Sequence, residues 1–75
     1  MTELQSLDAG NNQISDVSPL AGLTKLRTLY LQYNQITDVS PLAGLQNLEN
    51  LYLYNNEIED FSPLDSLPEG VYISK

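Results

Sequence analysis

Apolar residues recur along this chain with a period of 22 residues. Leu4, Leu26 and Leu48 mark the beginning of three successive units, and most residues between them recur in step. A repeat of this length predicts similar supersecondary units that stack and share one core. We therefore expect a single domain over residues 1–75, built from repeats 4–25, 26–47 and 48–69 and a partial closing strand at 70–75.

The first part of each unit has the hydrophobic pattern of a short strand. Leu29 and Leu31 alternate with polar or aromatic residues at period two, as do Leu51 and Leu53. This pattern is typical of a strand with one buried face. A strand of about three residues cannot bury its leucines alone, so the units should stack as a parallel sheet with a spacing of about 4.8 Å.

The second part of each unit predicts a tight helical turn. Ser18, Ser40 and Ser62 each precede a proline. This order favours a serine N-cap followed by proline at the first helical position. Because only a few residues remain before the next unit, a short 3₁₀ turn is favoured over a full α-helix. The expected fold is an α/β-type solenoid that is mostly β, with short 3₁₀ turns on its convex side.

An asparagine recurs where the chain should turn away from the strand. Its side chain carries amide donors and a carbonyl acceptor, so it can satisfy backbone groups of adjacent coils. Recurrence at the same phase of each unit favours a structural role over a catalytic one for Asn12, Asn34 and Asn56.

The units resemble the leucine-rich repeat family. The signature L-x-x-L-x-L-x-x-N-x-L is present twice, as Leu26, Leu29, Leu31, Asn34 and Ile36, and as Leu48, Leu51, Leu53, Asn56 and Ile58. The unit length and the closing Asp-Val-Ser-Pro-Leu-Ala-Gly-Leu segment look like the bacterial internalin type. This resemblance implies a right-handed superhelix, with the parallel sheet on its concave face and protein ligands bound there. Ala9 departs from the pattern, because the later units carry leucine at that position.

Charge narrows the class of partner. The chain has 3 Lys and Arg residues against 10 Asp and Glu residues, a net charge of −7, and most of the acidic residues lie in the third unit. Nucleic acid needs clustered basic residues and is therefore not expected as a partner. A basic or neutral protein surface is compatible, although acidic residues that only keep a terminal repeat soluble are the alternative. No apolar run approaches the roughly 20 residues that span a membrane, so no membrane partner is expected.

Catalytic chemistry has little support in this composition. The chain has neither His nor Cys, and its recurring serines stand beside prolines. Residues 8–12 resemble the opening of a calcium loop, but Pro19 stands where a bidentate glutamate is needed. We therefore expect no enzyme, cofactor or metal. Without cysteines, the sequence also gives no indication of the compartment.

The tyrosines are the best candidates for binding. Tyr30 and Tyr52 lie between inward leucines, so they should point out of the concave face, one above the other. The remaining expected ligand-binding residues are their neighbours: Tyr54, Tyr33, Thr28, Asn50, Gln32 and Arg27. Tyrosines mixed with amides and hydroxyls are typical of binding surfaces. Aromatic pairs that only stabilise a sheet are the alternative.

The first unit shows no polar cap of the kind that closes solenoids. Its apolar residues should therefore lack a cover on one side: Leu4, Leu7, Ile14, Val17, Leu20 and Leu23. This predicts a homodimer through the uncapped N-terminal repeat. For function, we expect a non-catalytic protein-interaction module that binds a protein ligand through a tyrosine-rich concave face. The alternative is a minimal or designed consensus repeat unit with a structural or self-assembly role.

Overall fold

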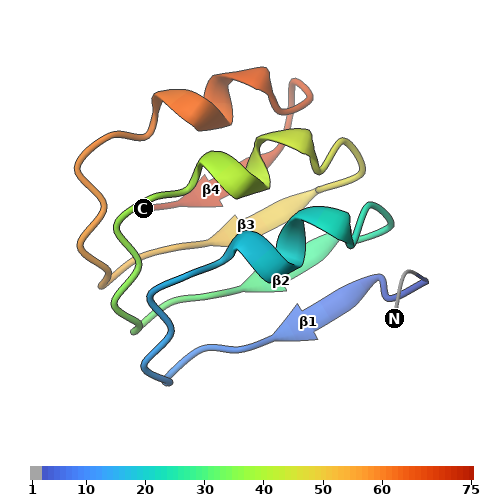
Figure 1. The fold of residues 1–75 in the computed structure, drawn as a ribbon. Helices are drawn as coiled ribbons and strands as arrows, with labels where there is room; N and C mark the ends of the chain where they lie inside the picture. Colours follow the sequence, from blue (N-terminus) through green and yellow to red (C-terminus); the bar gives the residue numbers. More distant parts are fainter. Residues whose placement is uncertain (1–2) are drawn as a thin grey trace.

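The computed structural model describes residues 3–75, which wind into an open right-handed stack of coils (Figure 1). Each coil adds one strand to a four-stranded parallel sheet in the order β1-β2-β3-β4. The strands are β1 (Ser6–Asp8), β2 (Thr28–Tyr30), β3 (Asn50–Tyr52) and β4 (Tyr72–Ser74). The opposite side carries the 3₁₀ helices η1 (Ser18–Gly22), η2 (Ser40–Gly44) and η3 (Ser62–Ser66). The predicted solenoid of short strands and 3₁₀ turns is confirmed.

The register of the sheet follows the sequence repeat. Leu7 pairs with Leu29, Leu29 with Leu51, and Leu51 with Ile73. The central leucine of each strand points inward because neighbouring residues of a strand point to opposite faces. Every outward residue therefore lies beside its counterpart from the next coil, which makes columns of side chains on the sheet.

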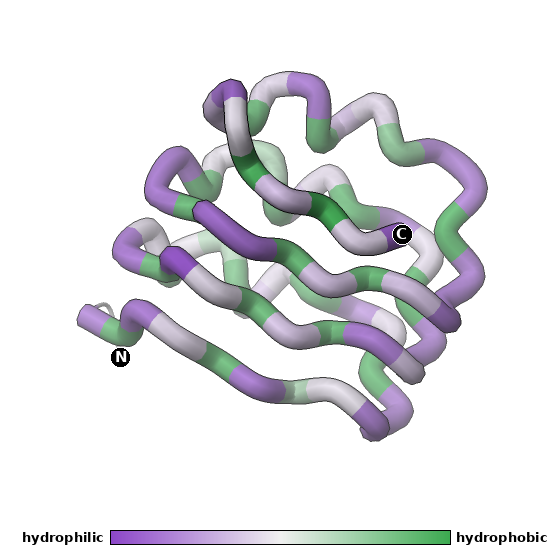
Figure 2. The backbone as a smooth tube through the Cα atoms, turned by 180° about the vertical axis from the view of Figure 1, so that it is seen from behind, coloured by the Kyte–Doolittle hydropathy of each residue, from purple (hydrophilic) through white to green (hydrophobic). Residues whose placement is uncertain are grey.

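The core lies between the sheet and the 3₁₀ helices. Hydrophobic and hydrophilic residues alternate along each coil in Figure 2. Leu29, Leu31 and Ile36 of the second coil are completely buried, and Leu51 of the third coil is as well. The second coil has a neighbour on both sides, which explains why its apolar residues are the best covered.

The predicted capping role of the serines is wrong. Ser18, Ser40 and Ser62 are the first residues of their 3₁₀ helices and make no side-chain capping bond. The N-cap positions are Val17, Val39 and Phe61. Their side chains pack against the core and cannot cap. The serine backbone N–H instead donates to an aspartate two residues earlier, at 2.9 Å in each coil, namely Asp16, Asp38 and Asp60. The recurring aspartates thus make the turn that starts each helix.

The apolar residues of the first coil are better covered than the sequence predicts. Val17 is only 1% exposed and Leu23 only 8% exposed. Both pack into the common core with the second coil. The partly buried hydrophobic residues of this coil are Leu4, Leu7, Ala9, Ile14 and Leu20. The expected exposure is therefore correct only in part, because residues of one coil are covered by the following coil as well as by a preceding one. Among the helices of residues 3–75, none is long and apolar enough to cross a membrane.

Candidate functional site

Asn34 connects two coils through its side chain. Its Oδ1 accepts a hydrogen bond from the backbone N–H of Ile14 at 3.0 Å. Its Nδ2 donates to the carbonyl oxygens of Leu31 at 2.9 Å and Ala9 at 3.0 Å. Asn34 is the one polar residue that is buried among residues 3–75, at 8% exposure. Such bonds satisfy backbone groups that the turn leaves without strand partners.

The same pattern recurs one coil later and is incomplete one coil earlier. Asn56 accepts from the N–H of Ile36 at 3.0 Å and donates to Leu31 and Leu53. Asn12 is exposed and donates only to carbonyl groups of its own coil. Asn34 and Asn56 thus form a ladder of side-chain hydrogen bonds between coils.

The concave side of the sheet carries a column of tyrosine rings. Tyr30 and Tyr52 are neighbours in the register, and their rings stack with centroids 4.7 Å apart and planes 6° apart. Tyr72 continues the column with its ring centroid 5.8 Å from that of Tyr52, at an interplanar angle of 61°. Strand pairing sets the stack of Tyr30 and Tyr52, because outward residues of adjacent parallel strands are held at strand spacing. Tyr72 is the register partner of Asn50, so its ring reaches Tyr52 from the neighbouring position of β4.

A second aromatic pair lies just after the strands. Tyr33 and Tyr54 meet edge to face, with centroids 5.5 Å apart and planes 81° apart. Tyr33 is 51% exposed and has a backbone φ of 59°. Asn11 and Asn55 have nearly the same φ at the equivalent positions. Asparagine tolerates this left-handed conformation well, whereas tyrosine adopts it rarely. The backbone conformation at position 33 is therefore unfavourable for tyrosine.

The polar residues of the predicted site are divided between two places. Thr28 and Asn50 are register partners on the sheet and are half-buried. Gln32 lies over Gly10, where a Cβ atom would come within 2.5 Å of its Nε2. The Oε1 atom of Gln32 is buried and has no hydrogen-bond partner among residues 3–75. Gln32 is thus packed against the backbone of the first coil.

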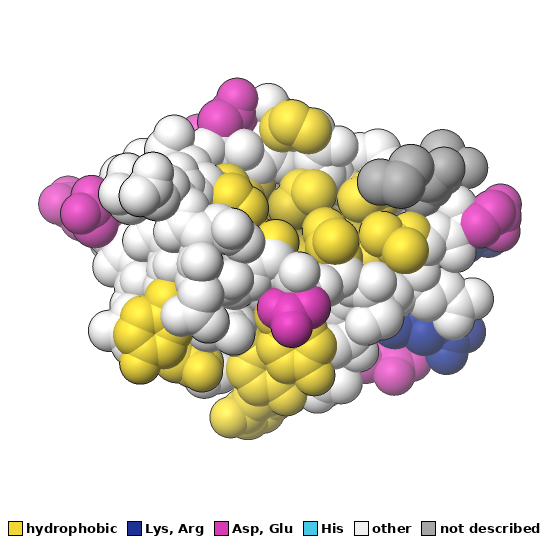
Figure 3. Space-filling model, turned by 90° about the horizontal axis from the view of Figure 1, so that it is seen from below, with side chains coloured by type: hydrophobic (Ala, Val, Ile, Leu, Met, Phe, Trp, Pro, Cys, Tyr) yellow, Lys and Arg dark blue, Asp and Glu magenta, His cyan; other side chains and the backbone are white. Residues whose placement is uncertain are grey.

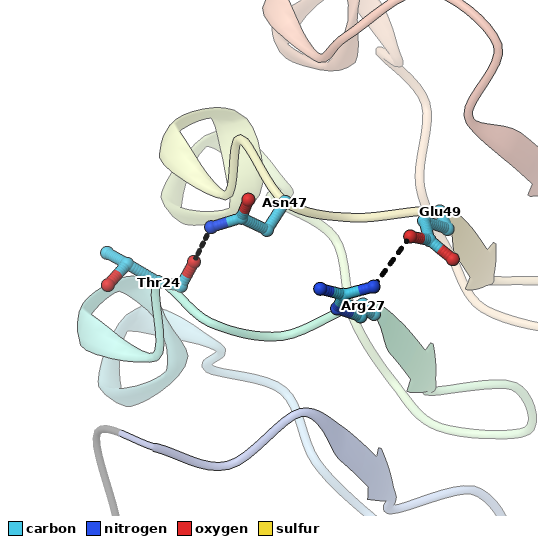
Figure 4. A network of polar contacts seen from close by, with 4 residues as sticks. All are labelled: Thr24, Arg27, Asn47 and Glu49. Atoms are coloured by element: carbon cyan, nitrogen blue, oxygen red, sulfur yellow. Dashed lines mark hydrogen bonds and ion pairs between the residues drawn. The ribbon is translucent and has the colours of Figure 1, made fainter.

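Arg27 lies outside this face. It precedes β2 and pairs with Glu49, which precedes β3, with 3.3 Å between Nη1 and Oε2 (Figure 4). The same figure shows Asn47 donating to the Thr24 carbonyl oxygen at 2.8 Å. Both side chains of the ion pair are more than half exposed, so water screens the pair and its stabilising effect is small. This ion pair thus lies just before the strands, whereas Tyr30 and Tyr52 lie on them.

Two aspartates of the turns have perturbed acidity. The backbone N–H of Ser18 donates to Asp16, and together with the Ser18 side chain it holds the pKa of Asp16 below its ordinary value. The Ser62 backbone and side chain lower the pKa of Asp60 in the same way. Both carboxylates face solvent at the start of a helix, so these shifts reflect turn geometry rather than a catalytic environment.

The described residues offer a broad surface instead of a cavity. Residues 3–75 contain no pocket, and none of their carboxylates come together in a group that could hold a metal ion. Sequence reasoning missed Asp8, which is the register partner of Tyr30, and the close approach of Gly10 to Gln32. The phase of Asp8, 22 residues before Tyr30, was the available signal.

Comparisons with known proteins agree with this geometry. The family model described as leucine-rich repeats (2 copies) matches residues 2–44 and 24–66. An internalin C2 of Listeria monocytogenes is similar over 97% of this chain and 32% of its own, with 46% identity and a TM-score of 0.93. An internalin InlF of Listeria monocytogenes is similar over 96% of this chain and 22% of its own, with 42% identity and a TM-score of 0.90.

A more distant structure has the same architecture. A leucine-rich repeat protein of Leptospira interrogans is 25% identical and has a TM-score of 0.74, over 95% of this chain and 19% of its own. This chain therefore spans at most about a third of each of these proteins. No curated protein sequence matches.

Proposed function

Because the chain belongs to the leucine-rich repeat family, we propose that it is a non-catalytic protein-interaction module that binds a protein ligand through its tyrosine-rich concave face. The leucine-rich repeat fold is a typical protein-interaction module, and proteins of this kind are typically not enzymes. The observation that carries the proposal is the column of Tyr30, Tyr52 and Tyr72, with the pair Tyr33 and Tyr54 beside it.

The tyrosines suit recognition for energetic reasons. A tyrosine has few rotatable bonds, so ordering it on binding costs little conformational entropy for a large contact area. Stacking already fixes the rings of Tyr30 and Tyr52 in the free protein, which reduces this cost further. A rigid aromatic surface at the centre of an interface is where the largest binding contributions are commonly found.

The charge of the chain supports a neutral or basic protein as the ligand. The net charge is −7, and the third repeat supplies most of it through Glu57, Glu59, Asp60, Asp65 and other residues. A surface of this sign attracts complementary partners during diffusion and repels nucleic acid.

Photo-crosslinking tests this proposal directly. A p-benzoylphenylalanine probe at position 52 should capture a protein, whereas the same probe at the exposed Gln35 should not. The captured protein is identified, purified and titrated by calorimetry. Tyr30→Ala with Tyr52→Ala should then weaken binding by about 30-fold per ring, which corresponds to about 2 kcal/mol each. Gln13→Ala with Gln35→Ala is the matched control and should bind normally. Undiminished binding by a folded tyrosine double variant would place the site elsewhere, with the acidic third repeat as the next candidate.

Self-association is a second candidate function, and a specific surface favours it. Viewed from the β1 end, the molecule presents a group of hydrophobic side chains near its centre (Figure 3). Leu4, Leu7, Ile14 and Leu20 of the first coil are only partly buried. Two chains that meet at this end would bury both apolar surfaces in one two-fold contact, whereas a preceding repeat in a longer protein would cover the same surface.

The edge of β1 is less suited to extending the sheet. Asp8 Oδ1 accepts the Gly10 backbone N–H at 3.2 Å, and Asn12 donates to the Ala9 and Gly10 carbonyl oxygens. A charged residue on a strand is a feature that discourages edge-to-edge pairing, and the backbone groups satisfied here lie just after β1. A dimer would therefore depend mainly on the leucine side chains. Sedimentation should show a dimer that Leu20→Lys dissociates and the exposed control Thr37→Lys does not. A folded parent that sediments as a monomer would contradict this candidate.

A further inference from the structure

The tyrosine column stops at β1. Asp8, Tyr30 and Tyr52 occupy equivalent outward positions of adjacent strands. The rings of Tyr30 and Tyr52 stack at 4.7 Å, which is close to the spacing between neighbouring strands. A third ring would continue this stack from β1, but that position holds the short side chain of Asp8. Within residues 3–75, no aromatic ring covers the face of Tyr30 that is turned toward β1.

The outward residues of β1 and Gly10, which follows it, are small. Ser6, Asp8 and Gly10 are all small, whereas the equivalent positions of the next coil hold Thr28, Tyr30 and Gln32. Gln32 covers Gly10, whereas among residues 3–75 no aromatic ring stacks over Asp8. Viewed from this end, an acidic side chain lies beside hydrophobic ones in the lower part of Figure 3. The result is a step, defined by Asp8 and Tyr30, with a carboxylate at its base and an aromatic face as its wall.

The carboxylate of this step is oriented but not neutralised. Asp8 is exposed, and its Oδ1 is fixed by the Gly10 N–H. Its Oδ2 has no hydrogen-bond partner in the part of the chain that is described. Two of the three basic side chains are engaged elsewhere, since Arg27 pairs with Glu49 and Lys75 lies 5.0 Å from the centre of the Phe61 ring. The step thus presents an acceptor to an external cation.

We propose that this step binds the guanidinium group of an arginine side chain from a protein partner. A guanidinium is planar and stacks on aromatic rings, so it can occupy the space that a third ring would have filled. Its N–H groups project in the plane and can donate to a carboxylate at the edge of the stack. The net charge of −7 favours the approach of a cation. This inference rests on the proposed function of the concave face and names the chemistry of one contact within it.

A short peptide tests the contact without knowledge of the partner. The probe is acetyl-Gly-Arg-Gly-amide, and its matched control contains citrulline, which has the same shape without the charge. Ring protons of Tyr30 and the amide of Gly10 are followed by nuclear magnetic resonance during titration. The arginine peptide should shift both signals with an affinity in the range of about 1–10 mM, as expected of one exposed charged contact. The citrulline peptide should bind at least about fivefold more weakly.

Variants of the step make the test specific. Asp8→Asn retains an acceptor for the Gly10 N–H but removes the charge, and it should reduce arginine binding to the citrulline level. Tyr30→Leu should remove the stacking surface and have a similar effect. Glu57→Gln removes one exposed negative charge from another repeat and should leave binding unchanged. Equal binding of arginine and citrulline, equal losses in the Asp8 and Glu57 variants, or equal binding of a lysine peptide would each overturn the proposal.

The peptide titration and the crosslinking experiment can fail independently, so they test the arginine contact and the proposed function separately. If the arginine peptide fails to bind but the tyrosine double variant still loses its crosslinked partner, only the inference about the Asp8 and Tyr30 step is wrong. If the peptide binds as expected while the double variant retains its partner, the step binds arginine but the concave face is not the site of that partner.

Discussion

Replacing Asn34 with leucine should destabilise the fold by about 1–3 kcal/mol, and the hydrogen bonds of Asn34 explain this magnitude. The carbonyl oxygens of Ala9 and Leu31 each receive a second amide, from Asn12 and Asn56 respectively. They therefore retain a partner in the variant. The backbone N–H of Ile14 has no acceptor among the described residues other than Asn34 Oδ1. The expected cost is that of one partly buried donor without a partner.

Urea denaturation followed by far-ultraviolet circular dichroism measures this cost. A chain of this size has a total stability of about 3–5 kcal/mol unless its packing is unusually regular. With a slope near 1 kcal/mol per molar urea, the midpoint should fall by about 1–3 M. Asn12→Leu is the control, because Asn12 is exposed and accepts no backbone N–H in residues 3–75. It should cost less than about 1 kcal/mol. Parent-like stability of the Asn34 variant, or equal losses at both positions, would refute the reasoning.

Three further predictions follow from local geometry. Tyr33→Asn should be more stable than Tyr33→Ala by about 0.5–1 kcal/mol in the same assay, because both lose the ring contact with Tyr54 but asparagine tolerates a φ of 59°; equal stabilities would contradict the strain. Carboxyl signals of Asp16 and Asp60 should titrate below the usual aspartate pKa. Because these pKa values are lowered, their stabilising effect is present above about pH 4 and is lost as the pH falls through the folded-state values; ordinary titration would count against the turn bonds. Gln32→Met should raise the free energy of unfolding by up to about 1 kcal/mol, since it removes a buried oxygen that lacks a partner; a loss of stability would indicate an unseen bond.

The repeat explains why the strands could be predicted from the sequence. Leu29 and Leu51 each lie at the centre of a short alternating pattern. The same strand position is therefore predicted independently in two units, and a wrong assignment in one unit would have disagreed with the other. Parallel stacking followed because no single unit can bury its own leucines. The column of Tyr30 and Tyr52 was predictable for the same reason, since its geometry depends only on register.

Features that depend on three-dimensional detail were not predictable. Serine and aspartate both make helix-start contacts, and only the backbone geometry reveals that Asp16 rather than Ser18 makes the bond. The burial of Val17 depends on how far the second coil covers the first. The conformation of Tyr33 could have been anticipated, because Asn11 and Asn55 at the same phase are residues that favour positive φ.

The backbone of each strand and 3₁₀ helix of this solenoid approaches its counterparts in adjacent coils most closely. Each coil is stabilised mainly by its neighbours, so local unfolding can start at either end and advance one coil at a time. A ligand bound across the tyrosine column would contact β2, β3 and β4 together and would hold these three coils in place relative to one another. Amide protons at the C-terminal end, which the ligand would join to the two preceding coils, should then exchange more slowly in the complex.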